Sequence, residues 1–448
     1  MQALWPPHIF SEFIVEYTIV ATTLLVTFFL MLGGGVWVAL ALLGVGVIGM
    51  ELFGGAPAGS ILASTSWTSS SSWTLTALPL FIWMGEILFR TKLSEDMFRG
   101  LAPWVRLLPG RLLHVNVLGC GIFAAVSGSS AATAATIGRI SLPELKSRGY
   151  PDAIAMGSLA GAGTLGLLIP PSIMMIVYGV AAQVSISRLF IAGILPGLLL
   201  LAIFSGYLML WAACNRSKLP EEGERLPFMD KLRRAKLLIP VLGLIVAVIG
   251  SIYGGIATAT EAAAVGVVGA LLIALISGAL TRETFMASLM GAVSTSCMIF
   301  FILLGAAYLT SAMSFTGLPA ALADWIIAKQ LSPYLLLLAL TLFFIALGCF
   351  LDGISIILLT TAVILPAVQA AGIDLLWFGI FVILVVEMAQ ITPPVGFNLF
   401  VIQNLTGRNL GAVARASFPF FLLLVLAAIL ITLFPQIVLA LPEAMRGA

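Results

Sequence analysis

Charged side chains are scarce in this chain of 448 residues: Asp, Glu, Lys and Arg together make up 9% of it, whereas 61% of its residues are hydrophobic. Soluble domains carry roughly 25% charged residues, so a soluble globular protein is excluded. The formal net charge of +2 is too small and too scattered for a nucleic-acid-binding surface. The composition is that of an integral membrane protein, for which the lipid bilayer is the solvent.

Histidine and cysteine are also rare. The two histidines, His8 and His114, and the four cysteines lie far apart, so the sequence contains no cluster with the spacing of a metal site. Most of the cysteines lie in apolar runs, which favours buried thiols over a disulfide framework. The P-loop pattern GxxxxGK[ST] is missing, so we do not expect ATP hydrolysis. Glu12 and Glu16 stand where a signal peptide would carry basic residues, which argues against a cleaved leader.

Apolar runs that approach the length of a membrane span, about 20 residues, occur ten times. We predict spans at residues 15–32, 36–54, 74–90, 152–180, 189–213, 237–256, 259–280, 288–312, 375–403 and 414–440. Two further regions, 112–146 and 334–371, are interrupted at their centres by glycine or serine and fit two half-length helices better than one span. We expect re-entrant hairpins there, with tips surrounded by protein or water instead of lipid.

Lysine and arginine predict the orientation, because cytoplasmic loops of membrane proteins carry the positive excess. One orientation leaves only Arg188, Lys329 and Arg446 of the 21 cations in the periplasm. In this orientation both termini and the polar segment 54–74, which we expect to be a loop, are periplasmic. The two hairpins then enter the membrane from opposite faces.

The two halves of the sequence match at an offset of 223 residues. The offset aligns three features, namely Pro170-Pro171 with Pro393-Pro394, Leu142-Pro143 with Leu365-Pro366, and Gly149 with Gly372. Each half holds five predicted spans and one hairpin, and because five is odd the second half starts from the opposite face. We therefore predict an all-α polytopic membrane protein with two inverted-topology repeats, residues 1–214 and 237–448, joined by a cytoplasmic linker at 215–236. Such repeats are typical of secondary transporters. The linker is most simply a solvated connector, and the alternative is a regulatory or lipid-binding role for its basic end "KLRRAK".

Each proline pair falls inside a predicted span, 152–180 or 375–403. Proline lacks a backbone donor and clashes with the preceding turn, so each pair is expected to end a half-helix at the midplane. The carbonyls freed before the break can bind a cation, and the free amides of the following helix can bind an anion. Packing kinks are the alternative, which we would favour for one proline but not for two matched pairs.

The hairpin centres carry oxygen atoms. Ser127, Ser129, Ser130 and Thr133 lie in the first hairpin, and oxygen ligands suit a hard cation such as sodium. Small-residue helix packing explains that segment equally well. The offset places Ser129 opposite Asp352 in the second hairpin. A carboxylate in the membrane costs at least ~2.5 kcal/mol, so Asp352 is our first candidate for a cation ligand or gate, ahead of a salt bridge or a helix cap.

Three other acids have simpler interpretations. Glu86 is expected to pair with Arg90, and Glu261 is expected in the first turn of a helix. Glu387 either binds a cation or braces the second break. No lysine or arginine lies in the predicted core, so a carboxylate solute would meet bound cations, helix N-termini and hydroxyls, which favours sodium-driven symport.

Two other functions compete with symport. In an intramembrane enzyme Asp352 and Glu387 would form a carboxylate pair, but the duplicated breaks would then serve no purpose. An autonomous carrier would work without other proteins.

Five segments carry a resemblance to a known family: "FAAVSGSSAATAATIG", "GTLGLLIPPSIMMIVYG", "YGGIATATEAAAVGVV", "FLDGISIILLTTAVILPAV" and "EMAQITPPVGFNLFV". In this order they resemble the large membrane subunit of tripartite ATP-independent periplasmic (TRAP) transporters. The resemblance implies an elevator-type fold and sodium-coupled uptake of small organic acids across the bacterial inner membrane. It also implies a separate small four-helix membrane subunit and a periplasmic substrate-binding protein as partners. The amphipathic stretches around Trp104 and Trp325 then look like arms between a static scaffold and a moving transport domain.

The same resemblance implies two sodium sites, each between a hairpin and a break, with Na+ as the transported coupling ion. The predicted ligands are Ser127, Gly128, Ser129, Ser130, Gly166 and Pro170 in the first site and Asp352, Gly353, Ser355, Thr392, Pro393 and Gly396 in the second. The residues predicted to contact substrate are Ser130, Thr133, Pro171, Ser172, Val395 and Asn398. Ala389 departs from the family pattern, in which glycine is common at this position.

Overall fold

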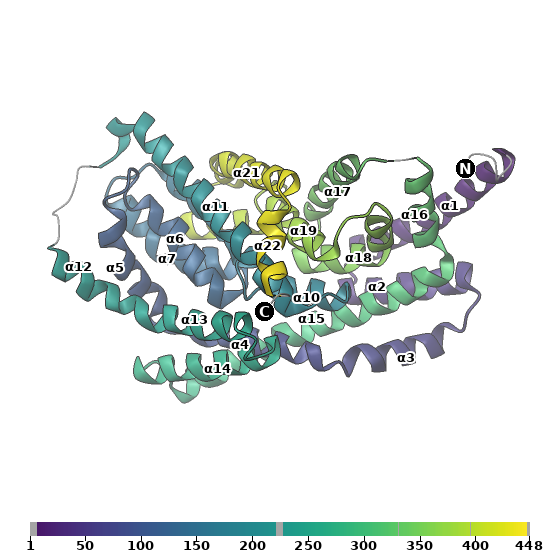
Figure 1. The fold of residues 1–448 in the computed structure, drawn as a ribbon, viewed down its shortest axis with the longest axis horizontal. Coiled ribbons are helices and arrows are strands. Elements are labelled where there is room, and N and C mark those ends of the chain that lie inside the picture. Colours follow the sequence, from purple (N-terminus) through teal and green to yellow (C-terminus); the bar gives the residue numbers. More distant parts are fainter. Residues whose placement is uncertain (1–6, 221–226, 330, 395, 446–448) are drawn as a thin grey trace.

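The computed structural model describes residues 7–220, 227–329, 331–394 and 396–445, which form helices without a β-strand (Figure 1). The first half contains α1 (Pro7–Gly33), α2 (Val38–Gly49), η1 (Met50–Gly54), α3 (Ala58–Ser70), η2 (Trp73–Thr76), α4 (Ala77–Phe89), α5 (Leu93–Val105), α6 (Leu113–Ser127), α7 (Ser130–Ser147), α8 (Asp152–Gly163), α9 (Leu165–Leu168), α10 (Ile173–Ala181), α11 (Ile186–Cys214) and η3 (Arg216–Lys218). The second half contains α12 (Phe228–Ala235), η4 (Lys236–Leu238), α13 (Ile239–Tyr253), α14 (Ala259–Ile276), α15 (Arg282–Thr316), α16 (Leu318–Ala328), α17 (Pro333–Gly348), α18 (Gly353–Ala370), α19 (Leu375–Gln390), α20 (Phe397–Thr406), α21 (Leu410–Leu433) and α22 (Gln436–Ala444). The predicted all-α class is confirmed.

Five helical segments of the described chain are long and apolar enough to cross a membrane, or up to eight if each bent pair forms one span. The five are α11, α14, α15, α21 and the segment Phe228–Tyr253, which contains α12 and α13. Several other predicted spans form shorter apolar helices, among them α19. The total of ten spans therefore stays a prediction.

The two hairpins and the two proline breaks lie where the sequence predicts them. The hairpin predicted at 112–146 is the pair α6 and α7, and the one predicted at 334–371 is the pair α17 and α18. The span predicted at 152–180 is interrupted between α9 and α10, with a bend of 43°. The span predicted at 375–403 is interrupted between α19 and α20. In both breaks the peptide bond within the proline pair is cis.

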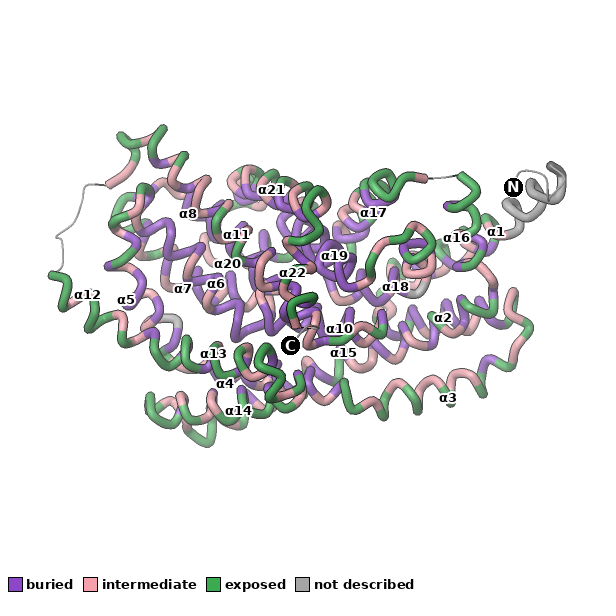
Figure 2. The backbone as a smooth tube through the Cα atoms, viewed as in Figure 1, coloured by how far each residue is buried: buried purple, intermediate pink, exposed green. Residues whose placement is uncertain are grey.

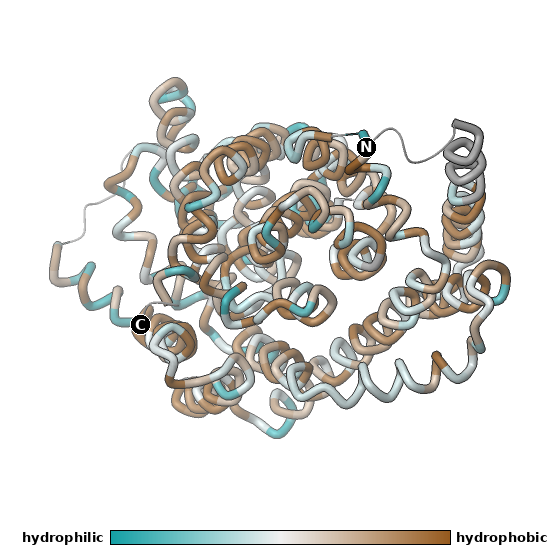
Figure 3. The backbone as a smooth tube through the Cα atoms, turned by 45° about the vertical axis from the view of Figure 1, so that its right-hand side comes forward, coloured by the Kyte–Doolittle hydropathy of each residue, from teal (hydrophilic) through white to brown (hydrophobic). Residues whose placement is uncertain are grey.

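Helix α19 lies in the core of the molecule. Every residue from Leu376 to Gln390 is buried, as the continuous purple of this helix in Figure 2 shows. A helix that is apolar on all sides is stable only when other helices surround it. Helices α10 and α11 of the first half and α17, α18 and α21 of the second half pack around α19. Figure 3 shows apolar residues along the outer helices too, as expected for surfaces in contact with lipid.

The segment predicted as a periplasmic loop at 54–74 is mostly helical, which corrects that expectation. Helix α3 runs alongside α15 (Figure 1). The Thr68 hydroxyl donates to the Ser64 carbonyl at 2.9 Å, so hydroxyl groups of this polar helix find acceptors within it. A hydrogen bond of 3.3 Å between Thr65 and Ser311 joins α3 to α15. Polar contacts of this kind hold a serine- and threonine-rich segment as a helix.

The predicted linker and arms also contain helices. Helix α12 lies within the segment 215–236, where the sequence suggests a solvated connector, and packs against α5. The amphipathic stretches around Trp104 and Trp325 form α5, which contains Trp104, and α16, which contains Trp325. Trp104 contacts Phe228 of α12 edge-to-face, with ring centroids 6.2 Å apart.

Candidate functional site

The tip of the first hairpin is a two-residue turn followed by a capped helix. Gly128 has φ +60°, a conformation that glycine adopts most readily, and reverses the chain after α6. The side chain of Ser129 then accepts a hydrogen bond from the Ala132 amide and caps α7. Hydroxyl oxygens of Ser127 and Thr133 lie 2.7 Å apart across the tip. Hydroxyl groups therefore surround the N-terminus of α7.

The first proline break lies directly against this tip. A methyl group placed on Gly166 would approach the Ser129 carbonyl oxygen to 2.5 Å, so only glycine permits this contact. The amide of Ile173, at the start of α10, donates to the Gly128 carbonyl at 3.3 Å. Ser172 caps α10 and donates its hydroxyl to the Leu167 carbonyl at 2.5 Å. The structure thus brings the hairpin and break segments of the predicted first sodium site together through backbone contacts.

The tip of the second hairpin is capped by its carboxylate. Asp352 accepts hydrogen bonds from the amides of Ile354 at 3.1 Å and Ser355 at 3.3 Å, and the Ser355 hydroxyl also donates to it. The helix cap, the less favoured interpretation of Asp352, is therefore present. Asp352 remains exposed and forms no ion pair with a described residue. Its role as a cation ligand remains a prediction.

The second proline break also lies near its hairpin. The thiol of Cys349, at the end of α17, donates to the Pro393 carbonyl at 3.8 Å. Thr392 donates its hydroxyl to the Met388 carbonyl at 2.6 Å, and its own carbonyl accepts from the Gly396 amide at 3.0 Å. These contacts form a tight turn between α19 and α20. Val395, predicted to contact substrate, lies outside the described residues.

Two buried polar residues of the second half face the first half. The Ser130 hydroxyl of the first hairpin donates to Glu387, which is fully buried on α19. The sequence suggests that a bracing Glu387 would hold the second break, whereas the structure joins it to the first hairpin. The repeat offers no help here, since the offset aligns Glu387 with Thr164.

Asn398 is the second of these buried residues. It is fully buried, and neither its side-chain oxygen nor its nitrogen has a hydrogen-bond partner among the described residues. A methyl group on Gly163 of α8 would lie 3.5 Å from the Asn398 nitrogen, which places this amide beside the first half. Buried amides are normally paired, so Asn398 is an exception, and its contact with substrate stays a prediction.

The expected pairings of two other acids are confirmed. Arg90 lies 3.1 Å from Glu86. Glu261 forms a capping box with Thr258 at the start of α14.

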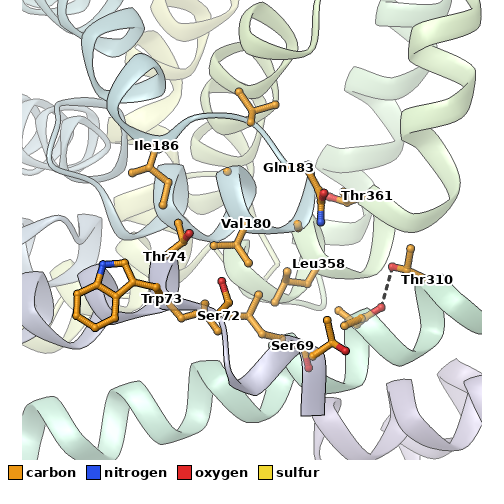
Figure 4. Close-up of a pocket in the computed structure, with 18 of the residues that line it drawn as sticks. Ser69, Ser72, Trp73, Thr74, Val180, Gln183, Ile186, Thr310, Leu358 and Thr361 are labelled. Carbon is orange, nitrogen blue, oxygen red and sulfur yellow. Dashed lines mark hydrogen bonds between the residues drawn. The ribbon is translucent and has the colours of Figure 1, made fainter. Parts of the chain in front are cut away.

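A cavity of about 970 Å³ lies away from the predicted site residues, none of which lines it. Helix α3, the loop between α10 and α11, α15 and α18 form its walls (Figure 4). Half of its lining residues are serine or threonine, and none of the described lining residues is charged. This cavity could not be predicted from the sequence, because one of its walls depends on α3 being helical.

Comparison with known proteins decides the family. The family model described as "Tripartite ATP-independent periplasmic transporter, DctM component" matches residues 25–437. The chain belongs to this family. It is 35% identical over 386 residues to the C4-dicarboxylate TRAP transporter large permease protein DctM of Pseudomonas aeruginosa, covering 85% of this chain and 89% of that protein. It is 31% identical over 382 residues to the sialic acid TRAP transporter large permease protein SiaM of Vibrio cholerae, covering 84% of this chain and 88% of that protein.

A solved structure supports the fold of this TRAP family member. The Alcanivorax borkumensis YdaH transporter has a TM-score of 0.63 to this chain and is 12% identical to it. The match covers 84% of this chain and 87% of the YdaH chain. At this identity the likeness shows the fold alone. The relatives are named as transporter permeases, which confirms that the chain is a multi-pass membrane transporter and excludes the enzyme hypothesis.

Proposed function

We propose that this TRAP large permease is a sodium-coupled symporter of a small organic acid in the bacterial inner membrane. One observation carries the proposal. Each proline break lies against a hairpin tip that offers hydroxyl, carbonyl or carboxylate oxygens, and no predicted site residue is a lysine or arginine. Such a site provides ligands for a hard cation and no fixed positive charge for an anion.

This arrangement supports coupling between the ion and the solute. Helix N-termini carry a partial positive charge, and α7 and α10 both begin where the first hairpin meets the first break. A carboxylate there would find amides and hydroxyls but no cationic side chain. Bound Na+ would supply the missing charge, so that the acid binds well only after sodium.

The duplicated hairpins and breaks support two inverted repeats, residues 1–214 and 237–448. The distribution of lysine and arginine supports termini in the periplasm. We further propose an elevator motion in which α5 and α16 act as arms beside the moving hairpins. Helix α5 packs against α7 of the first hairpin, and α16 packs against α18 of the second.

The solute is proposed to be a carboxylic acid, because the relatives named above carry C4-dicarboxylates and sialic acid. The same family membership supports two partners, a small membrane subunit and a periplasmic binding protein that selects the acid.

Reconstitution in liposomes tests this function. Uptake of the acid bound by the cognate binding protein should require an inward sodium gradient, the small subunit and the loaded binding protein. Uptake by this chain alone would show an autonomous carrier and overturn the tripartite part of the proposal. Uptake that ignores the sodium gradient would overturn the coupling.

Mutations at the tips test the sodium assignment. Asp352→Ala and Ser129→Ala should weaken the sodium dependence of uptake more than they weaken folding. Asp352→Asn is the matched control for the helix cap, because an amide retains an acceptor for α18 but lacks the charge. If the alanine and asparagine variants both transport with an unaltered sodium response, Asp352 is not an ion ligand.

A further inference from the structure

The cavity of about 970 Å³ between α3, α15, α18 and the loop from α10 to α11 has no role in the sodium and substrate predictions. Its volume falls in the range of pockets that hold small organic molecules, ~300–1,000 Å³. Its lining includes part of the segment 54–74, which we predict on the periplasmic side. The cavity therefore lies on the side from which an imported solute would arrive.

The walls formed by α3, α15 and α18 present hydrogen-bond acceptors. The hydroxyl groups of Thr68, Thr310 and Thr361 line the cavity, and each donates its proton to a carbonyl of its own helix. A hydroxyl group has one proton and two lone pairs, so these oxygens can only accept from a molecule in the cavity. Hydroxyl donors of a solute would satisfy them, whereas an ionised carboxylate, which only accepts, would not.

The wall formed by the loop and the start of α11 presents donors instead. Ile186 and Ser187, at the start of α11, line the cavity, and their amides have no acceptor within the helix. Helix N-termini favour negative charge. The amide side chain of Gln183, in the preceding loop, lines the same wall (Figure 4). Helix α14 also begins at the cavity, but Glu261 already caps its N-terminus. The donors for a carboxylate therefore gather at α11.

The backbone of Gln183 is a second indication of a binding role. Its φ is +56°, in the left-handed region that only glycine adopts without cost. The side chain is exposed, so packing does not require glutamine at this position. Strained backbone of this kind is concentrated at ligand sites. Glycine would relieve the strain but would remove the amide.

We propose that this cavity binds the solute on the periplasmic side and that the solute is a hydroxylated organic acid. Its carboxylate would lie at the start of α11 beside Gln183, and its hydroxyl groups would face α3, α15 and α18. The inference rests on the proposed function in taking the solute to be an acid, and it narrows that acid to one that carries hydroxyl donors. The lining, half serine and threonine with no charged residue among the described ones, fits such a molecule better than a simple dicarboxylate.

Tartrate and succinate provide matched probes, because they share a carbon chain and carboxylates and differ only in hydroxyl groups. Binding of each acid to the full chain is measured in detergent by equilibrium dialysis, in sodium buffer. Tartrate should bind more tightly than succinate. Thr310→Val should weaken tartrate binding about fivefold, the worth of one hydrogen bond, and should leave succinate binding unchanged.

Thr432→Val on α21 is the matched control. The Thr432 hydroxyl also donates to a carbonyl of its own helix, at 2.7 Å, but Thr432 does not line the cavity. This variant should bind both acids as the unaltered protein does. Thr68→Val is a second lining variant, should Thr310→Val fail to fold.

Gln183→Gly should weaken the binding of both acids about fivefold, because it removes a donor to the carboxylate. It should not lower the unfolding temperature, because glycine fits this backbone conformation. Unaltered binding by Gln183→Gly would overturn the placement of the carboxylate.

Three other outcomes would overturn the proposal: no binding of tartrate to the unaltered chain, succinate bound as tightly as tartrate, or equal effects of Thr310→Val and Thr432→Val. The dialysis contains no sodium gradient, small subunit or binding protein. Its result is therefore independent of the liposome experiment, and a failure of sodium-coupled uptake is distinguishable from a failure of binding in the cavity.

Discussion

Gly348, the last residue of α17, lies against Ala389 of α19. A methyl group added to Gly348 would come within 2.2 Å of the Ala389 methyl carbon, and both residues are buried. The contact therefore holds a single methyl group, that of Ala389, and has no room for a second one. We predict that Gly348→Ala destabilises the protein and that adding Ala389→Gly restores it.

The geometry sets the magnitude. Carbon atoms in contact lie ~3.5–4.0 Å apart, so a separation of 2.2 Å forces the two helices apart by more than an ångström. Overpacking of this kind costs about 1–3 kcal/mol. Ala389→Gly alone removes one buried methyl group and places glycine near a helix end, at a cost of about 1 kcal/mol. The double variant restores one methyl group to the contact, so its stability should lie near that of the unaltered protein.

Thermal unfolding in detergent measures the four members of this double-mutant cycle. The two substitutions should deviate from additivity by more than about 0.5 kcal/mol, the limit for independent sites. Uptake of the solute should follow the same order, because α17 leads into the tip with Asp352. Additive losses, with no recovery in the double variant, would refute the packing of Gly348 on Ala389.

Two further predictions concern the first hairpin. Gly166→Ala should cost about 1–3 kcal/mol and abolish uptake, because the new methyl group meets the backbone at Ser129. Gly206→Ala on α11 is its control, since nothing lies within 4 Å of the added carbon, and equal effects in the two variants would contradict the close contact. Glu387→Ala should cost about 1–3 kcal/mol by removing the acceptor of the Ser130 hydroxyl, whereas Glu387→Gln retains an acceptor and should cost less. Thermal unfolding distinguishes the two variants. Identical melting temperatures for the alanine and glutamine variants would show that this hydrogen bond does not contribute to the stability of the protein.

Local chemistry made much of the fold predictable. Gly128 and Ser129 end one helix and cap the next through their own backbone and side chain, so the first tip is visible in the sequence. The proline pairs end their half-helices for an equally local reason. The resemblance to the family placed the segment with Gly166 beside the first tip, but the close approach of Gly166 to the Ser129 backbone is visible only in the structure.

Contacts between residues far apart in the sequence could not be predicted in this way. The partner of Glu387 lies 257 residues away, and the offset that relates the halves gives this acid no counterpart. The helical state of α3 was missed because its composition favours a loop, whereas contacts with α15, such as Thr65 with Ser311, help to hold it as a helix.

The sequence by itself determined three properties of this protein: that it is a membrane protein, at which residues its helices break, and to which family it belongs. Those properties follow from the length of apolar runs and from the backbone limits of glycine and proline, which act within a few residues. Only the tertiary structure decided that Glu387 meets Ser130, that Ala389 packs on Gly348, and that α3, α15 and α18 line one cavity. Such pairings depend on how whole helices are placed against one another, and no short stretch of sequence contains that information.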